Sequence, residues 1–299
     1  MFVLVDTENI DDLGSDAIRW LTIDRKAKEE TLCRIFAEFE RKGVVAVAIK
    51  GWAIARYYPD TRLRSYTDID LAVCPDDFVA AKALLELSEL RKFNIDLHVG
   101  LRDRDTLDWA DLLARTYTVD LNGVQIRVLS DEDNLRVTAS HWLIDGGVYK
   151  DRLWDIYYLV RNRKANFDWS RSLEAAGPIR KSWVIAAIAA ARDYLSLDVS
   201  DLPDEIRQFE LPTWFKRSIV REWTRGPYLR IPLWMCIRKP RTFIEQIRRR
   251  FPPNSIAATA DTEGMIDASS RVGFQVRSII KKVRPFVSGL GRVKRERAK

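Results

Sequence analysis

The sequence predicts an α+β fold in which a domain of strands and helices precedes an all-helical domain. Apolar runs of strand length alternate with helical patterns up to about residue 130. Asn122-Gly123 lies between two alternating apolar–polar runs, which is typical of a β-hairpin. After residues 130–165 only helical patterns follow, and 299 residues are enough for two small domains.

The first predicted elements are a helix, a buried strand and a short helix. Apolar residues recur at helical spacing over Lys26–Lys42, and Gly43 follows as a helix stop. The continuous β-branched run Val44–Ile49 is typical of a buried strand. Gly51 ends this strand, and Trp52–Tyr58 is expected to form the short helix.

The alternation of strands and helices then continues. Tyr66–Val73 and Phe93–Val99 are predicted strands, and Asp77–Arg91 between them is a predicted helix. Tyr117–Leu121 and Val124–Leu129 are the two strands of the expected hairpin, because both residues of the intervening turn tolerate positive φ.

Helical patterns fill the chain after Ser130, which resembles an N-cap followed by acidic residues in the first turn. Further helices are expected over Arg152–Arg163, Ile179–Leu197 and Leu211–Arg225. We therefore predict an N-terminal extension over residues 1–24, an α+β domain over 25–165, and a helical domain with a basic tail over 166–299.

Composition favours a cytoplasmic protein whose partners carry phosphates. The net charge of +7 suits nucleotides, nucleic acid or an anionic membrane face. Three scattered cysteines argue against a disulfide framework and fit a reducing compartment. No signal peptide is recognised, and the longest apolar stretch, Trp183–Ala191, is far shorter than the ~20 residues of a membrane span.

Three carboxylates follow the predicted strands in a pattern that suggests a metal site. Asp68 and Asp70 project to the same side of one strand, and Asp96 lies in the next strand. Like charges this close need a cation or water between them. The chain has only two histidines, His98 and His141, and no zinc-binding spacing, so carboxylates that hold Mg²⁺ or Mn²⁺ are favoured.

The bare Asp-x-Asp pattern is not specific. It recurs at Asp103/Asp105 and Asp131/Asp133, in polar-loop and helix-start contexts that suggest no chemistry. Only Asp68/Asp70 lies within an apolar strand. The alternative for Asp68 is an ordinary cap or turn aspartate.

Five short motifs resemble a known family. In order, they are Lys50-Gly51, Tyr58-Pro59, Arg64, Asp68-Ile69-Asp70 and Asp96-Leu97-His98. With these motifs the chain resembles a family of largely uncharacterised bacterial nucleotidyltransferases. That family lies within the DNA polymerase β-like nucleotidyltransferase superfamily. The resemblance covers about residues 30–160 and implies a mixed sheet flanked by helices, with the turn after the first strand beside the triphosphate.

The resemblance also implies roles for individual residues. Asp96 would bind the catalytic metal and help to deprotonate the attacking hydroxyl. His98 would bind substrate or orient a carboxylate, although a satisfied, partly buried histidine is the alternative. His141 and Asp155 also match family positions, but a polar contact between helices is expected for both. The implied metal ligands and catalytic residues are Asp68, Asp70 and Asp96, and the implied nucleotide-binding residues are Lys50, Gly51 and Arg64.

The expected reaction is metal-dependent transfer of a nucleoside monophosphate from an NTP, with release of pyrophosphate. The acceptor would be a hydroxyl or phosphate on a small molecule, a peptide or protein side chain, or an RNA end. Arg64 would clamp a phosphate, unless it pairs with Asp60 or Asp68 instead.

Two other functions compete. Val3–Ile10 resembles the first strand of a PIN-like or NYN-type nuclease, with Asp6 and Asn9 opening a metal site, but the later order of elements does not fit. A non-catalytic module could bind nucleotide or nucleic acid through the basic C-terminal half, where Arg277–Lys299 holds nine Lys or Arg. The aromatics interleaved with basic residues there fit a helical core better; they are Trp214, Trp223, Tyr228 and Trp234, among Lys216, Arg217, Arg221, Arg225 and Arg230.

Overall fold

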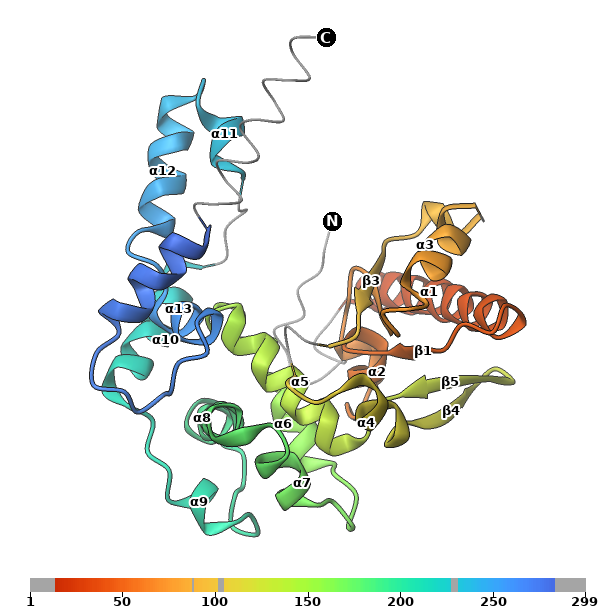
Figure 1. Ribbon diagram of the computed structural model, residues 1–299, viewed down its shortest axis with the longest axis horizontal. Coiled ribbons are helices and arrows are strands. Elements are labelled where there is room, and N and C mark those ends of the chain that lie inside the picture. Colours follow the sequence, from red (N-terminus) through yellow and green to blue (C-terminus); the bar gives the residue numbers. More distant parts are fainter. Residues whose placement is uncertain (1–13, 88, 102–104, 227–230, 283–299) are drawn as a thin grey trace.

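The computed structural model describes residues 14–87, 89–101, 105–226 and 231–282. Figure 1 shows a five-stranded sheet with flanking helices on one side of the molecule and a larger helical region on the other. The predicted α+β fold with a helical C-terminal region is therefore confirmed.

The sheet is mixed and has the strand order β3-β2-β1-β5-β4. β1 pairs antiparallel with β2 and parallel with β5, while β2 pairs parallel with β3 and β4 antiparallel with β5. The strands are β1 (Ala46–Ala48), β2 (Ile69–Val73), β3 (Ile95–Val99), β4 (Tyr117–Leu121) and β5 (Val124–Val128).

The hairpin between β4 and β5 forms as predicted. Asn122 and Gly123 have φ values of 54° and 84°, the left-handed pair that a tight two-residue turn requires. Leu121 pairs with Val124 across this turn.

The helix before the sheet is longer than the sequence pattern indicated. α1 spans Ser15–Arg41, so it begins within the predicted N-terminal extension, and it buries Leu32, Ile35 and Phe39. The other elements up to the hairpin are α2 (Gly51–Ala55), η2 (Thr61–Leu63), α3 (Phe78–Leu87), η3 (Glu89–Lys92) and α4 (Trp109–Ala114), of which η2 and α4 were not predicted.

Different helices cover the two faces of the sheet. Leu71 and Val128 belong to the cluster that α1 and α3 complete, whereas Ile49 and Ala72 pack with α4 and α5. Because side chains alternate along a strand, the residues on either side of Leu71 in β2 point toward the α4 and α5 face. That face carries the polar residues described below.

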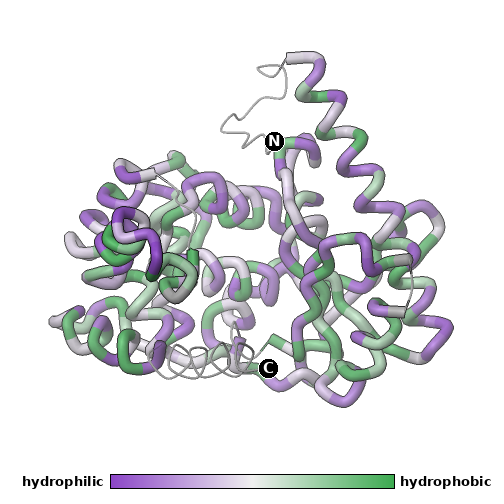
Figure 2. The backbone as a smooth tube through the Cα atoms, turned by 90° about the horizontal axis from the view of Figure 1, so that it is seen from above, coloured by the Kyte–Doolittle hydropathy of each residue, from purple (hydrophilic) through white to green (hydrophobic). Residues whose placement is uncertain are grey.

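Most of the remaining helices pack around α8, whereas α11 and α12 lie apart from it (Figure 1). The apolar stretch Trp183–Ala191 lies within α8 and is buried throughout, at the centre of the largest cluster of core residues. Figure 2 shows hydrophilic residues on the outer turns of both halves. The helices are α5 (Asp131–Ile144), α6 (Leu153–Arg161), α7 (Trp169–Glu174), α8 (Gly177–Leu195), α9 (Asp204–Arg207), α10 (Thr213–Arg225), α11 (Leu233–Cys236), α12 (Pro240–Arg250) and α13 (Ser255–Asp261).

The core also takes in two of the aromatic residues of the C-terminal half. Trp214 and Trp223 pack against the cluster around α8, and the Trp223 Nε1 donates to the Gly147 carbonyl at 2.8 Å. The interpretation of these two side chains as core residues is therefore confirmed. Within the described part of the chain, no helix has both the length and the apolar character needed to cross a bilayer.

One edge of the sheet gathers the ends of four strands. β1 and β5 run toward this edge, and β2 and β3 start from it. Lys50, Asp70, Asp96 and Ser130 consequently lie close to the same edge. The predicted site residues come from strands that neighbour one another there.

Candidate metal centre at the sheet edge

The turn between β1 and α2 directs a lysine back toward β2. Lys50 has φ 49° and ψ −144°, a conformation that is rare for a residue with a side chain, and Gly51 has φ 23°. A Cβ atom on Gly51 would lie 3.3 Å from the Tyr66 ring, so the close approach of this turn favours glycine. Lys50 is buried, and its Nζ donates to Asp70 Oδ1.

Asp70, Asp96 and His98 form a compact group at this edge. Asp70 pairs with Asp96 in the β2–β3 register, and His98 lies two residues further along β3 on the same face. His98 Nε2 lies 3.0 Å from Asp96 Oδ2 and 3.2 Å from Asp70 Oδ1. One ligand atom from each of the three residues lies within 4.8 Å of the others.

The two carboxylates of this group differ in exposure. The Asp96 side chain is 50% exposed, whereas that of Asp70 is 6% exposed. Burial alone would raise the pKa of Asp70, but the hydrogen bond with His98 and the charge of Lys50 lower it below the ordinary value of 3.8. The buried carboxylate is therefore held in its charged form.

This donor set fits a divalent cation. Two carboxylate oxygens and an imidazole nitrogen are ligands that Mn²⁺ accepts readily and that Mg²⁺ accepts in part, since Mg²⁺ prefers oxygen. The ammonium of Lys50 already lies beside Asp70 Oδ1 and 3.4 Å from His98 Nε2. The group of Asp70, Asp96 and His98 thus attracts a positive charge that the chain itself supplies, the ammonium of Lys50.

Asp68 lies outside this three-residue group. It directly precedes β2, is half-buried, and accepts a hydrogen bond from Thr67 Oγ1 at 3.2 Å. Its position two residues before Asp70 places it toward the same face of the sheet. The prediction that Asp68 binds metal stays a prediction.

Arg64 has a carboxylate partner in the helical region. Its Nε and Nη2 donate to the two oxygens of Asp155 at 2.5 and 2.8 Å, and both side chains are buried. Tyr58 Oη also donates to Asp155, at 2.7 Å. This arrangement links the end of η2 to α6. Asp60, which was an alternative partner for Arg64, pairs with Arg62 instead. Binding of phosphate by Arg64 stays a prediction.

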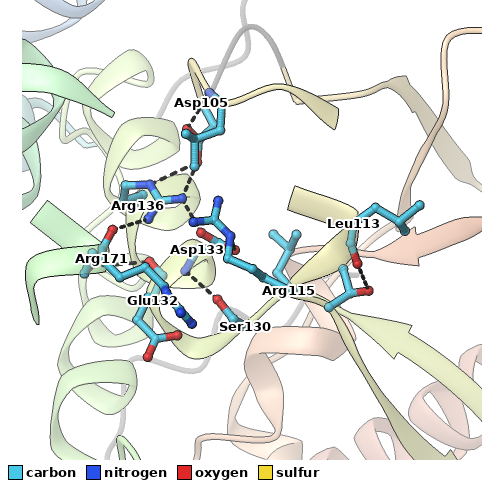
Figure 3. A network of polar contacts seen from close by, with 12 residues as sticks. Asp105, Leu113, Arg115, Ser130, Glu132, Asp133, Arg136 and Arg171 are labelled. Atoms are coloured by element: carbon cyan, nitrogen blue, oxygen red, sulfur yellow. Dashed lines mark hydrogen bonds and ion pairs between the residues drawn. The ribbon is translucent and has the colours of Figure 1, made fainter. Parts of the chain in front are cut away.

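One aspartate from each of the other two Asp-x-Asp patterns, Asp105 and Asp133, belongs to a buried ionic network (Figure 3). Arg136 of α5 is 1% exposed, and its Nη2 pairs with Asp105 at 3.0 Å and also with Asp133 Oδ1. Arg115 approaches Asp133 Oδ2 at 3.3 Å. Ser130 Oγ accepts from the backbone of Asp133, which confirms the predicted N-cap. We name this set of Asp105, Arg115, Asp133 and Arg136 the arginine network.

Sequence reasoning missed the arginine network. A usable signal was present, because Arg136 follows Asp133 by one helical turn within a helix that must pack on the sheet. His98 was expected only as an accessory residue, yet its ring nitrogen lies between the two carboxylates. His141, in contrast, lies 3.6 Å from Asp145 on its own helix.

Asp6 and Asn9, the residues of the nuclease alternative, lie outside the described residues, as do Tyr228 and Arg230. A nuclease of that type has a parallel sheet, whereas β1–β2 and β4–β5 are antiparallel pairs in this chain. The observed topology therefore does not support a nuclease of that type.

A mixed sheet that bears an acidic group beside a strand–turn–helix edge is the architecture expected of a nucleotidyltransferase-like domain. The profile of the family described as uncharacterised nucleotidyltransferase matches residues 15–190, and the chain belongs to this family. An antigenic nucleotidyltransferase-like protein from Paracoccidioides brasiliensis is similar over 65% of this chain and 94% of its own, with 12% identity and a TM-score of 0.40. A likeness at that level carries no weight for function. No curated protein matches the chain.

Proposed function

We propose that the protein transfers a nucleoside monophosphate from a nucleoside triphosphate to a hydroxyl or phosphate acceptor, with pyrophosphate as the second product. The observation that carries this proposal is the group formed by Asp70, Asp96 and His98 at the sheet edge. Membership of the nucleotidyltransferase family supports the reaction class. The expected cofactor is Mg²⁺ or Mn²⁺.

The protein would hold the ion through Asp70, Asp96 and His98, with Asp68 as a further ligand toward a second ion. A bound divalent ion would neutralise charge at the α-phosphate and lower the pKa of the attacking hydroxyl. Asp96 is the ligand that solvent reaches most easily, so we assign it to accept the proton of the acceptor hydroxyl.

Lys50 is assigned to the triphosphate. Its ammonium neutralises Asp70 in the structure described here, and its four-carbon chain allows the charge to turn from this carboxylate to an incoming phosphate. The turn at Gly51 brings the backbone close to the same place. When substrate binds, Lys50 would thus leave the Asp70 carboxylate and pair with a phosphate of the NTP.

The proposal is tested by calorimetric titration of each NTP, with Mg²⁺ or Mn²⁺, into the wild type and into the variant Asp70→Asn/Asp96→Asn. We expect metal-dependent binding of at least one NTP that the variant loses. A matched control is Asp76→Asn/Asp77→Asn, which removes the same charge from the loop before α3. Equal binding by the wild type and the site variant would overturn the assignment.

A further inference from the structure

A groove at the far end of the helical region is lined by arginines. Arg225 closes α10, and Arg241, Arg248 and Arg249 project from α12; Ile244 and Glu245 complete the lining. The groove has a volume of about 520 Å³. We call it the arginine groove. In Figure 1, α12 lies at the end of the molecule away from the sheet, so the groove is remote from the candidate metal centre.

Three arginines of the arginine groove have no carboxylate partner among the described residues. Arg225, Arg241 and Arg248 are exposed, and no carboxylate of the described chain forms an ion pair with any of the three. Residues 231–250 contain six Lys or Arg and one acidic residue, Glu245. Concentrated positive charge of this kind raises the local concentration of anions.

The helix presents one face to the groove and the opposite face to the protein. Arg241, Ile244, Glu245 and Arg248 recur at i, i+3, i+4 and i+7, which places them on one side of α12. Gln246, on the other side, is buried, and its Oε1 accepts from the backbone of Ile231 at 3.2 Å. The arginine face is consequently the one that the described part of the chain leaves open to a partner.

We propose that the arginine groove binds the phosphate backbone of a single-stranded nucleic acid. Arg241 and Arg248 lie two turns apart, or about 10 Å along the helix, which suits contacts to phosphates that are not adjacent on one strand. Arginine also binds phosphate bidentately, which a lysine ammonium does not. A lipid surface fits less well, because Ile244 is the only apolar residue among those that line the groove.

The same geometry makes this binding insensitive to sequence. The residues that line the groove include no aromatic side chain, and Trp214 and Trp223 pack, partly buried, against the helical core. Contacts would therefore be made to phosphates, which carry no sequence information. With Arg225, Arg241 and Arg248 contacting phosphates, the affinity is expected to fall with salt at a logarithmic slope of about −2. This binding does not depend on the nucleotidyl transfer proposed above.

The experiment measures fluorescence anisotropy of labelled oligouridine RNA of about 12 nucleotides, the length that single binding modules cover. Titrations of the full-length protein at several salt concentrations compare the wild type with Arg225→Gln/Arg241→Gln/Arg248→Gln. The control Lys26→Gln/Lys42→Gln/Arg91→Gln removes the same charge from exposed positions on α1, directly after α1 and on η3. Circular dichroism verifies that both variants fold.

We expect the groove variant to bind RNA at least about tenfold more weakly and with a shallower salt slope, while the control stays within about twofold of the wild type. Equal losses in both variants would overturn the proposal, because net charge alone would then explain binding. Wild-type binding to phosphatidylserine vesicles but not to RNA would overturn it in favour of a lipid partner. A parallel titration with oligothymidine DNA distinguishes the two kinds of strand.

Discussion

Asp105 and Asp133 surround the guanidinium of Arg136 in the interior, whereas Asp70 and Asp96 lie beside a histidine and a lysine at the sheet edge. Asp70, Asp105 and Asp133 belong to Asp-x-Asp patterns, and Asp96 lies in β3. The interior holds its two aspartates in fixed ion pairs, whereas the sheet edge leaves its two aspartates beside cations that can move or lose their charge. Arginine keeps its charge at any accessible pH and fixes its partners. Histidine and lysine can release or move their charge, and a half-exposed carboxylate remains within reach of solvent.

The counter-charge, rather than the aspartate pattern, separates a structural cluster from a chemical one. In the arginine network the oxygens of Asp133 face Arg136 and Arg115, and Asp133 is completely buried. At the sheet edge, half of the Asp96 side chain is open to solvent. Only the second environment leaves room for a ligand to enter.

The largest expected effect concerns the stability that the arginine network gives to the fold. Arg136→Met would leave Asp105 and Asp133 buried with less neutralising charge, at a cost of about 3–5 kcal/mol in the free energy of unfolding. Chemical denaturation measures this change. Adding Asp105→Asn and Asp133→Asn to the same chain should restore part of the loss. A cost below about 1 kcal/mol for the single variant would show that the network is not structural.

The next largest expected effect concerns the catalytic activity assigned to the sheet edge. Asp96→Asn should reduce turnover at least about a hundredfold, since metal-assisted chemistry supplies several kcal/mol of barrier lowering. The free energy of unfolding should change by no more than about 0.5 kcal/mol, because the side chain is half exposed. Activity assays and denaturation of the same preparation provide both values. A stable variant that retains full activity would exclude Asp96 from the reaction.

Lys50→Met sharpens the comparison, because it removes the movable cation from the sheet edge. Without the neighbouring ammonium, Asp70 should bind a divalent ion about tenfold more tightly, as the repulsion between the two cations is lost. Affinity for NTP should fall, since Lys50 is assigned to the phosphates. In this variant the affinity for metal, measured by metal titration, should therefore rise, and the affinity for NTP, measured by nucleotide titration, should fall. Weaker binding of both would count against the assigned role of Lys50.

The smallest expected effect concerns Asp151, a carboxylate whose neighbour Arg152 lies 4.0 Å away. Burial raises the pKa of Asp151, an effect that the charges of Arg152 and Arg64 only partly oppose. A raised pKa means that the stability due to this group is present at low pH and is lost as pH rises through the folded-state pKa. Asp151→Asn should thus raise Tm at pH 7, and the difference should close below about pH 4.

The strands and the hairpin were predictable because their signals are local. Val44–Ile49 has strand composition by itself, and Asn122-Gly123 demands positive φ whatever its tertiary context. The early start of α1 was missed because its first turns lack a strong apolar stripe: Trp20 and Ile23 are exposed.

The partners of charged residues were less predictable, because they depend on contacts between distant segments. Asp155 lies 91 residues after Arg64, and no sequence spacing joins the two. Lys50 was expected to contact phosphate, but its pairing with Asp70 follows from an unusual backbone conformation at the end of β1. The carboxylate pair across β2 and β3 was accessible from sequence, since it needs only that two neighbouring strands pair in register.

The most direct test of the central claim is a Mn²⁺ titration followed by electron paramagnetic resonance of the free ion. It compares the wild type with Asp70→Asn/Asp96→Asn and with His98→Ala, in the absence of nucleotide. We expect that the wild type binds Mn²⁺, that the double aspartate variant loses this binding, and that His98→Ala weakens it. Wild-type protein that binds no Mn²⁺, or a double variant that binds it equally well, would show that these residues do not form a metal site.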